Sequence, residues 1–121
     1  MIECYCKKAK RKDVKMQRDA IFIDKEQTLS VILPPEIDHH AAAPIREATD
    51  TRLFMLNPGL LIIDFSAVTF MDSSGIGYIL GRAALCEELG CRVRLVGLST
   101  SLMRIVRLSG IEKLKNLSIS D

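Results

Sequence analysis

The sequence predicts a single α/β domain built on a mixed β-sheet of four to five strands with helices packed on it. Short β-rich and apolar runs alternate with segments of helical periodicity in the order β-β-α-β-α-β-α-β. A chain of 121 residues, 48% of them hydrophobic, suffices for one domain whose core needs no disulfide or metal. We therefore expect one sheet whose faces are covered by the helices.

The first two strands are predicted at residues 20–23 and 28–33, both short and β-rich. The four polar residues 24–27 between them indicate a hairpin. Pro34 and Pro35 end the second strand, because proline has no N–H to donate to a strand ladder.

The first helix is predicted from Pro44, since proline fits the first turn of a helix. Apolar positions recur at helical spacing as far as Leu56, and the Asn-Pro-Gly sequence at 57–59 ends the pattern. The near-continuous apolar run at 60–65 is typical of a parallel strand that is buried on both faces.

The second helix is predicted from Ser73 to about Leu89, with Gly90 as its C-terminal stop. Its positions divide into two sides. The predicted core side is apolar and comprises Ile76, Ile79, Ala83 and Cys86. The other side is small and flat, which suits the docking of another molecule, and comprises Ser74, Gly77, Gly81, Ala84 and Glu88.

The remaining elements are a strand, a helix and a last strand. Residues 91–96 alternate arginine with apolar residues, as in a strand with one partly solvated face. Ser99 or Thr100 caps a third helix that runs to Gly110. Residues 114–119 are predicted to form the last strand.

The charge is distributed unevenly along the chain. The formal net charge is +2, but residues 1–15 carry +4 and residues 16–121 carry −2. We therefore expect residues 1–17 to form a basic, disordered tail and residues 18–121 to form the domain. The tail could bind nucleic acid or anionic lipid weakly through its charge. The alternative is that Met16 is the true start of the protein, since regular patterning begins just after it.

Several classes of protein are excluded by composition. No apolar run approaches the roughly 18 residues of a membrane span, and the N-terminus lacks the apolar core of a secretory signal. The four cysteines follow no disulfide or zinc spacing, and the adjacent His39 and His40 rarely ligate one ion together. We expect a cytoplasmic protein without a membrane segment, a metal or a cofactor.

The segment around Ser73 carries the strongest functional signal. It follows a predicted buried strand and opens a helix, where free N–H groups and the helix dipole favour an anion. Ser73 and Ser74 are either plain helix caps or hydroxyls that can carry a phosphate. Gly75 and Gly77 leave the backbone accessible to another molecule. Gly77 and Gly81 each cost about 1 kcal/mol of helix propensity, which indicates a close contact.

The residues at 71–77 and 79–82 resemble the STAS domain of anti-sigma factor antagonists. The resemblance covers roughly residues 18–119 and includes the segments 36–40 and 107–111 and the turn at Gly90. The paired histidines of the first of these segments, and the Gly-Arg pair at 81–82, are most similar to the sporulation-type members that release the forespore sigma factor.

The resemblance implies a switch controlled by phosphorylation. Members of the family bind an anti-sigma factor that is also a serine kinase of the histidine-kinase-like ATPase class, and thereby release a sigma factor. The kinase then phosphorylates the serine after the motif aspartate, here Ser73, with Ser74 the lesser candidate. A PP2C-type phosphatase restores the protein. ATP or ADP belongs to the partner, and no direct contact with DNA is implied.

The resemblance also implies which residues meet the partner. In relatives, the loop that holds Asp38 and His39 lies beside the phosphorylation loop. The expected contact residues are Asp38, His39, Asp72, Ser74, Gly75, Gly77, Gly81 and Arg82. A phosphate on Ser73 adds about −1.5 to −2 charges beside Asp72, which should weaken docking and leave the fold unchanged.

Two other functions remain open from the sequence. The chain could be a STAS scaffold, an interaction module of a transporter or stress-signalling complex, with Ser73 an unmodified cap. It could also be an enzyme with Ser73 as nucleophile and His39 or His40 as base. The motif lacks the Gly-x-Ser-x-Gly elbow of serine hydrolases, so we expect a non-enzymatic protein.

Overall fold

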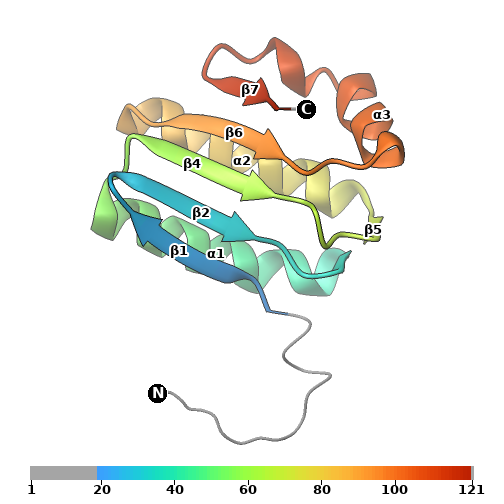
Figure 1. The fold of residues 1–121 in the computed structure, drawn as a ribbon, viewed down its shortest axis with the longest axis horizontal. Helices are drawn as coiled ribbons and strands as arrows, with labels where there is room; N and C mark the ends of the chain where they lie inside the picture. The colour runs from blue at the N-terminus through green and yellow to red at the C-terminus, as the bar shows by residue number, and fades with distance from the viewer. Residues whose placement is uncertain (1–18, 121) are drawn as a thin grey trace, which may run out of the picture.

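A mixed five-stranded sheet forms the centre of the computed structural model, which describes residues 19–120 (Figure 1). The strands lie in the order β1-β2-β4-β6-β7, with β1 antiparallel to β2 and the other neighbours parallel. Their bounds are β1 (Ile21–Lys25), β2 (Thr28–Ile32), β4 (Leu60–Asp64), β6 (Arg92–Val96) and β7 (Leu117–Ile119). The predicted fold class is confirmed. The predicted basic tail lies outside the described residues.

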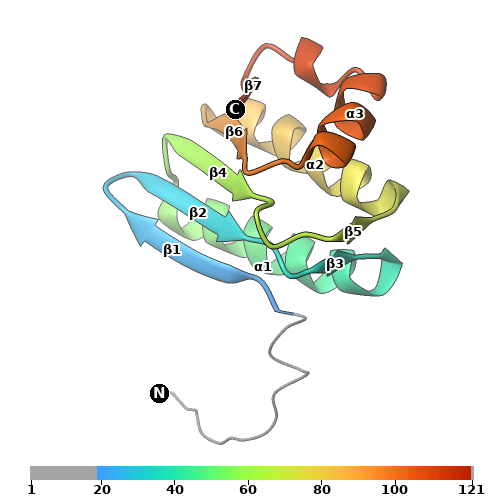
Figure 2. The same ribbon diagram turned by 45° about the vertical axis from the view of Figure 1, so that its right-hand side comes forward.

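The helices are α1 (His39–Leu56), α2 (Ser73–Leu89) and α3 (Thr100–Leu108), with a short 3-10 turn, η2 (Ile111–Lys113), before β7. The strand order from β2 to β7 advances in one direction, and right-handed crossovers then place the connecting helices on one side. α1 and α2 lie together behind the sheet (Figures 1 and 2). None of these helices is long and apolar enough to span a bilayer, as judged over residues 19–120.

The sheet is consequently buried on one face only. In β4, Leu61 and Ile63 are fully buried, whereas Leu60 and Ile62 are only half-buried. The prediction that this strand is buried on both faces is therefore wrong. The sequence shows the apolar run but not the direction in which successive strands are added.

The core lies between the sheet and the helices. The central strands supply fully buried side chains at alternate positions, namely Leu29, Val31, Leu61, Ile63, Val93 and Leu95. Each such side chain contributes about 1.5–3 kcal/mol through removal from water. From α2, Ile79, Ala83 and Cys86 are buried as predicted, but Ile76 is only half-buried, and Tyr78 and Arg82 are buried with the core side.

Helix α1 begins five residues earlier than Pro44, where the sequence analysis placed its first turn. Asp38 is the N-cap, and its side chain accepts a hydrogen bond of 2.9 Å from the N–H of Ala41. This cap favours the earlier start, and Pro44 consequently lies inside the helix, where it has no N–H to donate. His39 and His40 therefore belong to the first turn of α1 and not to a loop.

A second, two-stranded sheet was not predicted. β3 (Glu36–Ile37) pairs in parallel with β5 (Phe70–Met71), so that Ile37 lies opposite Met71. Strands of two residues are too short to show alternation in a sequence. The pairing matters because β3 leads directly into α1 and β5 leads directly into α2 (Figure 2).

The turn between β1 and β2 consists of two residues, Glu26 and Gln27, and not of the four residues 24–27 that were predicted. Both residues have positive φ, 52° and 67°, as in the type I′ turn that favours Asn-Gly. We expect Gln27→Gly to raise the free energy of unfolding by about 1 kcal/mol, because glycine has no left-handed penalty. Urea unfolding should show no such gain for Gln27→Ala, and equal stability of the two variants would contradict the argument.

Candidate functional site

Two aspartates lie next to each other where the small β3–β5 sheet ends. Asp38 directly follows β3 and Asp72 directly follows β5, and the N–H of Asp72 donates to the carbonyl of Ile37 at 3.2 Å. Because the two strands are parallel, their carboxyl ends share one edge. The structure thus brings the loop of Asp38 beside the loop of Ser73, although the two are far apart in the sequence.

Each of these aspartates caps a helix. The side chain of Asp72 accepts a hydrogen bond of 2.8 Å from the N–H of Ser74, as Asp38 does from Ala41. The cap of α2 is therefore Asp72, and the alternative that Ser73 or Ser74 is the N-cap is wrong. The two serines occupy the first two helical positions, and Ser73 is exposed. Within the described residues, no hydrogen bond engages the Ser73 hydroxyl.

The electrostatics of this surface combine two opposing contributions. The amino ends of α1 and α2 carry unpaired N–H groups and positive dipole ends. The hydrogen bond from the N–H of Ala41 lowers the pKa of Asp38 below its ordinary value of 3.8, so this carboxylate is ionised at neutral pH. The surface therefore holds fixed negative charge beside an exposed hydroxyl.

We expect the stability conferred by the Asp38 charge to depend on pH. A carboxyl with a lowered pKa in the folded state stabilises the fold above its unfolded pKa of about 3.9. That stability is lost as the pH falls through the lower, folded pKa. Asp38→Asn keeps a capping oxygen, so it should be less stable than the parent at pH 7, and the difference should shrink as the pH falls through the folded pKa. Asp38→Ala, which lacks the cap, should be less stable than the parent across the whole range, as judged by urea unfolding at each pH. A constant gap between Asp38→Asn and the parent would contradict this assignment.

A groove of about 260 Å³ lies between α1 and α2 next to the serines. α1 contributes His39, Ala42, Ala43 and Arg46 to its lining, and α2 contributes Ser74, Gly77 and Tyr78. Arg46 was missed by the sequence analysis. Arg46 and His39 are separated by about two helical turns. They share one face only if the helix begins at His39, and the sequence analysis began it at Pro44.

The three glycines of α2 have different roles. Within residues 19–120, a Cβ at Gly77 or at Gly81 would meet no atom within 4 Å, so the packing of this part of the chain does not require glycine at either position. A Cβ at Gly75 would collide with Cγ and Sδ of the buried Met71. Gly75 is therefore glycine because of packing inside the domain, and its expected role in leaving the backbone open to another molecule is not supported by the geometry.

Arg82 also faces inward. Its side chain is buried, and its Nε lies 2.7 Å from Oδ1 of Asp50 on α1. The two groups form an ion pair, but the angle at the N–H does not fit a hydrogen bond. The guanidinium lies 5.3 Å from the ring centroid of Tyr78, whose hydroxyl is 2.9 Å from Oγ1 of Thr49. Burial raises the pKa of Tyr78. These contacts join α1 to α2 beneath the groove.

The predicted site residues thus fall into two groups. A surface at the start of α1 and α2, here called the switch surface, collects most of them, and Gly81 lies one turn further along α2. The switch surface consists of Asp38, His39, Asp72, Ser73, Ser74 and Gly77, together with Arg46. Gly75 and Arg82 lie inside the domain. The described residues contain no cluster of three or more His, Cys, Asp or Glu side chains placed to hold a metal ion.

The chain is similar to known proteins over most of its length. The STAS domain model matches residues 22–119. The chain is 32% identical to the anti-sigma F factor antagonist of Lysinibacillus sphaericus over 85 residues, or 70% of this chain and 73% of the relative. It is 28% identical to the anti-sigma-B factor antagonist of Listeria monocytogenes over 96 residues, which cover 78% of this chain and 77% of the relative.

Solved structures show the same fold. The unphosphorylated form of the anti-sigma factor antagonist SpoIIAA superposes with a TM-score of 0.73 at 28% identity, over 85% of this chain and 89% of that one. The phosphorylated form of SpoIIAA, a Bacillus cell fate determinant, superposes with a TM-score of 0.68 at 28% identity, over 85% and 92% of the two chains. Together with the match to residues 22–119, these likenesses show that the chain belongs to the STAS domain family.

Proposed function

We propose that this protein is an anti-sigma factor antagonist that is switched off by phosphorylation of Ser73. In this proposal it binds an anti-sigma factor with serine kinase activity and so releases a sigma factor. The kinase then modifies Ser73, and a PP2C-type phosphatase reverses the modification. The protein itself catalyses no reaction. The observation that carries the proposal is the exposed hydroxyl of Ser73 at the start of α2, which makes no hydrogen bond within the described residues. It occurs in a chain whose relatives are named anti-sigma factor antagonists.

The contact with the partner is proposed to cover the switch surface and the outer side of α2. The open space above Gly77 and Gly81 lets a partner's backbone approach the helix closely. Leu80, 43% exposed on α2, and Phe70, 51% exposed on β5, supply apolar area at the two margins. Small residues flanked by exposed apolar side chains form the kind of surface on which a partner helix can dock.

The switch follows from the charges on this surface. The free N–H groups at the start of α2 can donate hydrogen bonds to a phosphate on Ser73 without loss of the helix. The same phosphate adds about −1.5 to −2 charges next to the carboxylates of Asp72 and Asp38. A closely fitting partner would then have to desolvate three anionic groups, so its affinity falls while the domain stays folded.

The test is phosphorylation by the candidate kinase. The protein is mixed with a candidate anti-sigma kinase and ATP, and the peptide spanning residues 70–82 is examined by mass spectrometry. We expect one phosphate, abolished by Ser73→Ala and retained in Ser74→Ala as the matched control. Tight binding without phosphate would support an unmodified interaction module instead, and hydrolysis of an ester substrate would support an enzyme.

A further inference from the structure

The groove between α1 and α2 combines small or buried residues with a few polar side chains. The small and buried part of its lining consists of Ala42, Ala43, Gly77 and Tyr78. The Tyr78 hydroxyl lies 2.9 Å from Oγ1 of Thr49 in the core, so it is not available to a ligand. The side chains that can offer a polar group to an entering molecule are therefore His39, Arg46 and Ser74.

Arg46 brings a positive charge without a counter-charge to this groove. It is exposed, and within residues 19–120 no carboxylate lies within ion-pair distance of its guanidinium. Asp50, one turn further along α1, is paired with Arg82 instead. Because helical side chains lean toward the amino end of their helix, Arg46 leans back toward His39, which lines the same groove.

The acidic groups near the start of α1 line a different cavity. That cavity, of about 390 Å³, is lined by Asp19, Glu36, Asp38, His40, Ala41 and Pro44. The switch surface thus presents the negative charge of Asp38 and the positive charge of Arg46 in two separate hollows. A partner that fits this surface has to match that separation of charge, and the groove itself favours an anion.

We propose that the groove binds an acidic side chain of the anti-sigma partner, whose carboxylate pairs with the guanidinium of Arg46. This inference rests on the proposed function, since the partner is the one that docks on the switch surface. Arginine presents parallel N–H groups that match the two oxygens of a carboxylate, and the Ser74 hydroxyl in the same groove can donate as well. A Cβ at Gly77 would meet no atom of residues 19–120 within 4 Å, so the entering side chain finds open space there.

An apolar side chain fits this groove less well than a carboxylate. It would shield Arg46 from water without supplying a counter-charge, and such desolvation of a charge is unfavourable. A carboxylate in the groove also makes the switch at Ser73 effective. A phosphate one residue before Ser74 adds charge of the same sign as the bound carboxylate, so the two repel each other and the partner is released.

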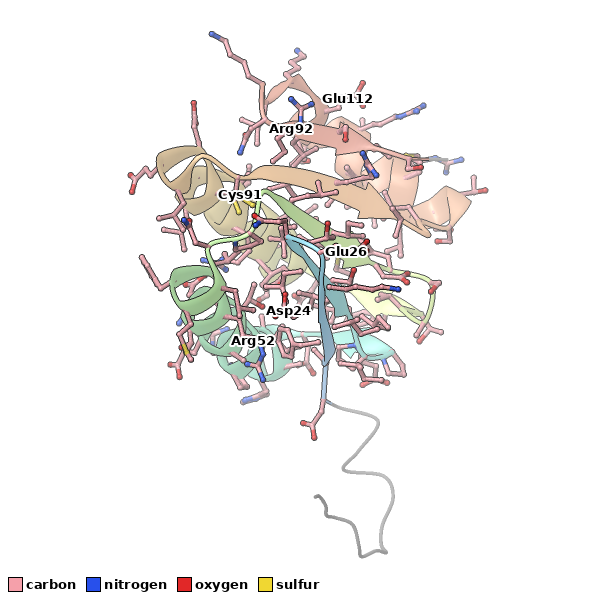
Figure 3. The ribbon with its side chains drawn as sticks, turned by 60° about the vertical axis from the view of Figure 1, so that its left-hand side comes forward. Asp24, Glu26, Arg52, Cys91, Arg92 and Glu112 are labelled. Atoms are coloured by element: carbon pink, nitrogen blue, oxygen red, sulfur yellow. The ribbon has the colours of Figure 1, made fainter. Side chains whose placement is uncertain are left out.

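Charge changes at Arg46 test the inference. Isothermal titration of the candidate anti-sigma kinase with the full chain should show that Arg46→Gln lowers the affinity about tenfold and Arg46→Glu about 100-fold. Urea unfolding should show unchanged stability for both variants, because the side chain is exposed. Arg92→Gln is the matched control, since Arg92 is also exposed and lies near Glu112, away from α1 (Figure 3). It should bind within about twofold of the parent.

Cross-linking identifies the group that enters the groove. Arg46→Lys keeps the positive charge and supplies an amine. A carbodiimide joins this amine to a contacting carboxylate as an amide, and the water lost from the two groups converts the carbodiimide to a urea. We expect tandem mass spectrometry of the complex to find this amide between the introduced lysine and an Asp or Glu of the kinase. Arg92→Lys, treated in the same way, should give no such amide.

The outcomes distinguish this inference from the proposed function. If the parent binds the kinase and Arg46→Glu binds it equally well, the groove takes no carboxylate and only the inference is overturned. The same holds if Arg46→Lys binds the kinase but yields no amide with it. A parent that binds no candidate kinase overturns the proposed function, and this inference with it.

Discussion

Replacement of Ser73 by aspartate should lower the affinity for the anti-sigma partner by at least tenfold while leaving the domain folded. An added carboxylate lies beside Asp72 and Asp38 on the switch surface, where a docked partner excludes water. At the first turn of α2 the same charge interacts favourably with the helix dipole by about 0.3–1 kcal/mol, which offsets repulsion from the caps. Isothermal titration with the partner, and urea unfolding of each variant, measure the two effects separately.

Ser73→Ala is the matched control for this experiment. It removes the hydroxyl but adds no charge, so we expect it to bind as tightly as the unmodified protein and to stay bound in the presence of ATP. Ser74→Asp places the charge one position along, in the groove between the helices, and tests whether position matters. Equal affinities of the parent, Ser73→Ala and Ser73→Asp would exclude the charge mechanism.

The second large effect is expected inside the domain, at Arg82. Arg82→Ala should lower the free energy of unfolding by about 2–3 kcal/mol, because it removes a buried side chain and leaves the Asp50 carboxylate unpaired. The Asp50 side chain is 29% exposed, so water recovers part of the loss and the cost stays below that of a fully buried pair. Arg82→Met, which keeps the packing, should cost less than Arg82→Ala.

A double-mutant cycle with Asp50→Ala isolates the ion pair, and urea unfolding of the four proteins gives the coupling energy. We expect coupling of about 1 kcal/mol or more. The cycle also decides between two roles for Arg82, because an internal residue should leave partner affinity unchanged in the folded Arg82→Met protein. If Arg82→Met bound the partner more weakly while remaining fully folded, Arg82 would be a partner-contact residue, as the sequence resemblance implied.

The elements that sequence analysis predicted well are those with local signals. The left-handed Asn57 ends α1 and the left-handed Gly90 ends α2, where Asn-Pro-Gly and glycine predicted stops. Ser99 caps α3 through the N–H of Leu102. Each of these signals is a property of a few neighbouring residues, so it can be recognised without the fold. The start of α1 was misplaced because two local signals, Asp38 and Pro44, competed.

The candidate site depended on the sequence for its residue types and on the fold for its geometry. The motif around Ser73 identified the family and the exposed hydroxyl, because serine and glycine at a helix start are a local pattern. The contact between the loops of Asp38 and Asp72 arises from two parallel residue pairs, Glu36 with Phe70 and Ile37 with Met71. Pairs 34 residues apart leave no periodic trace in a sequence.

The sequence by itself therefore determined the α/β class, the order of the helices and of the five strands of the main sheet, and the chemistry available at the start of α2. Only the tertiary structure decided which sheet face stays open, that Arg82 pairs with Asp50, and that Gly75 is required by Met71. The physical reason is that local propensity and capping act over a few residues. Burial depends instead on which distant segments fill the space around a side chain, and that is set by the direction in which parallel strands are added.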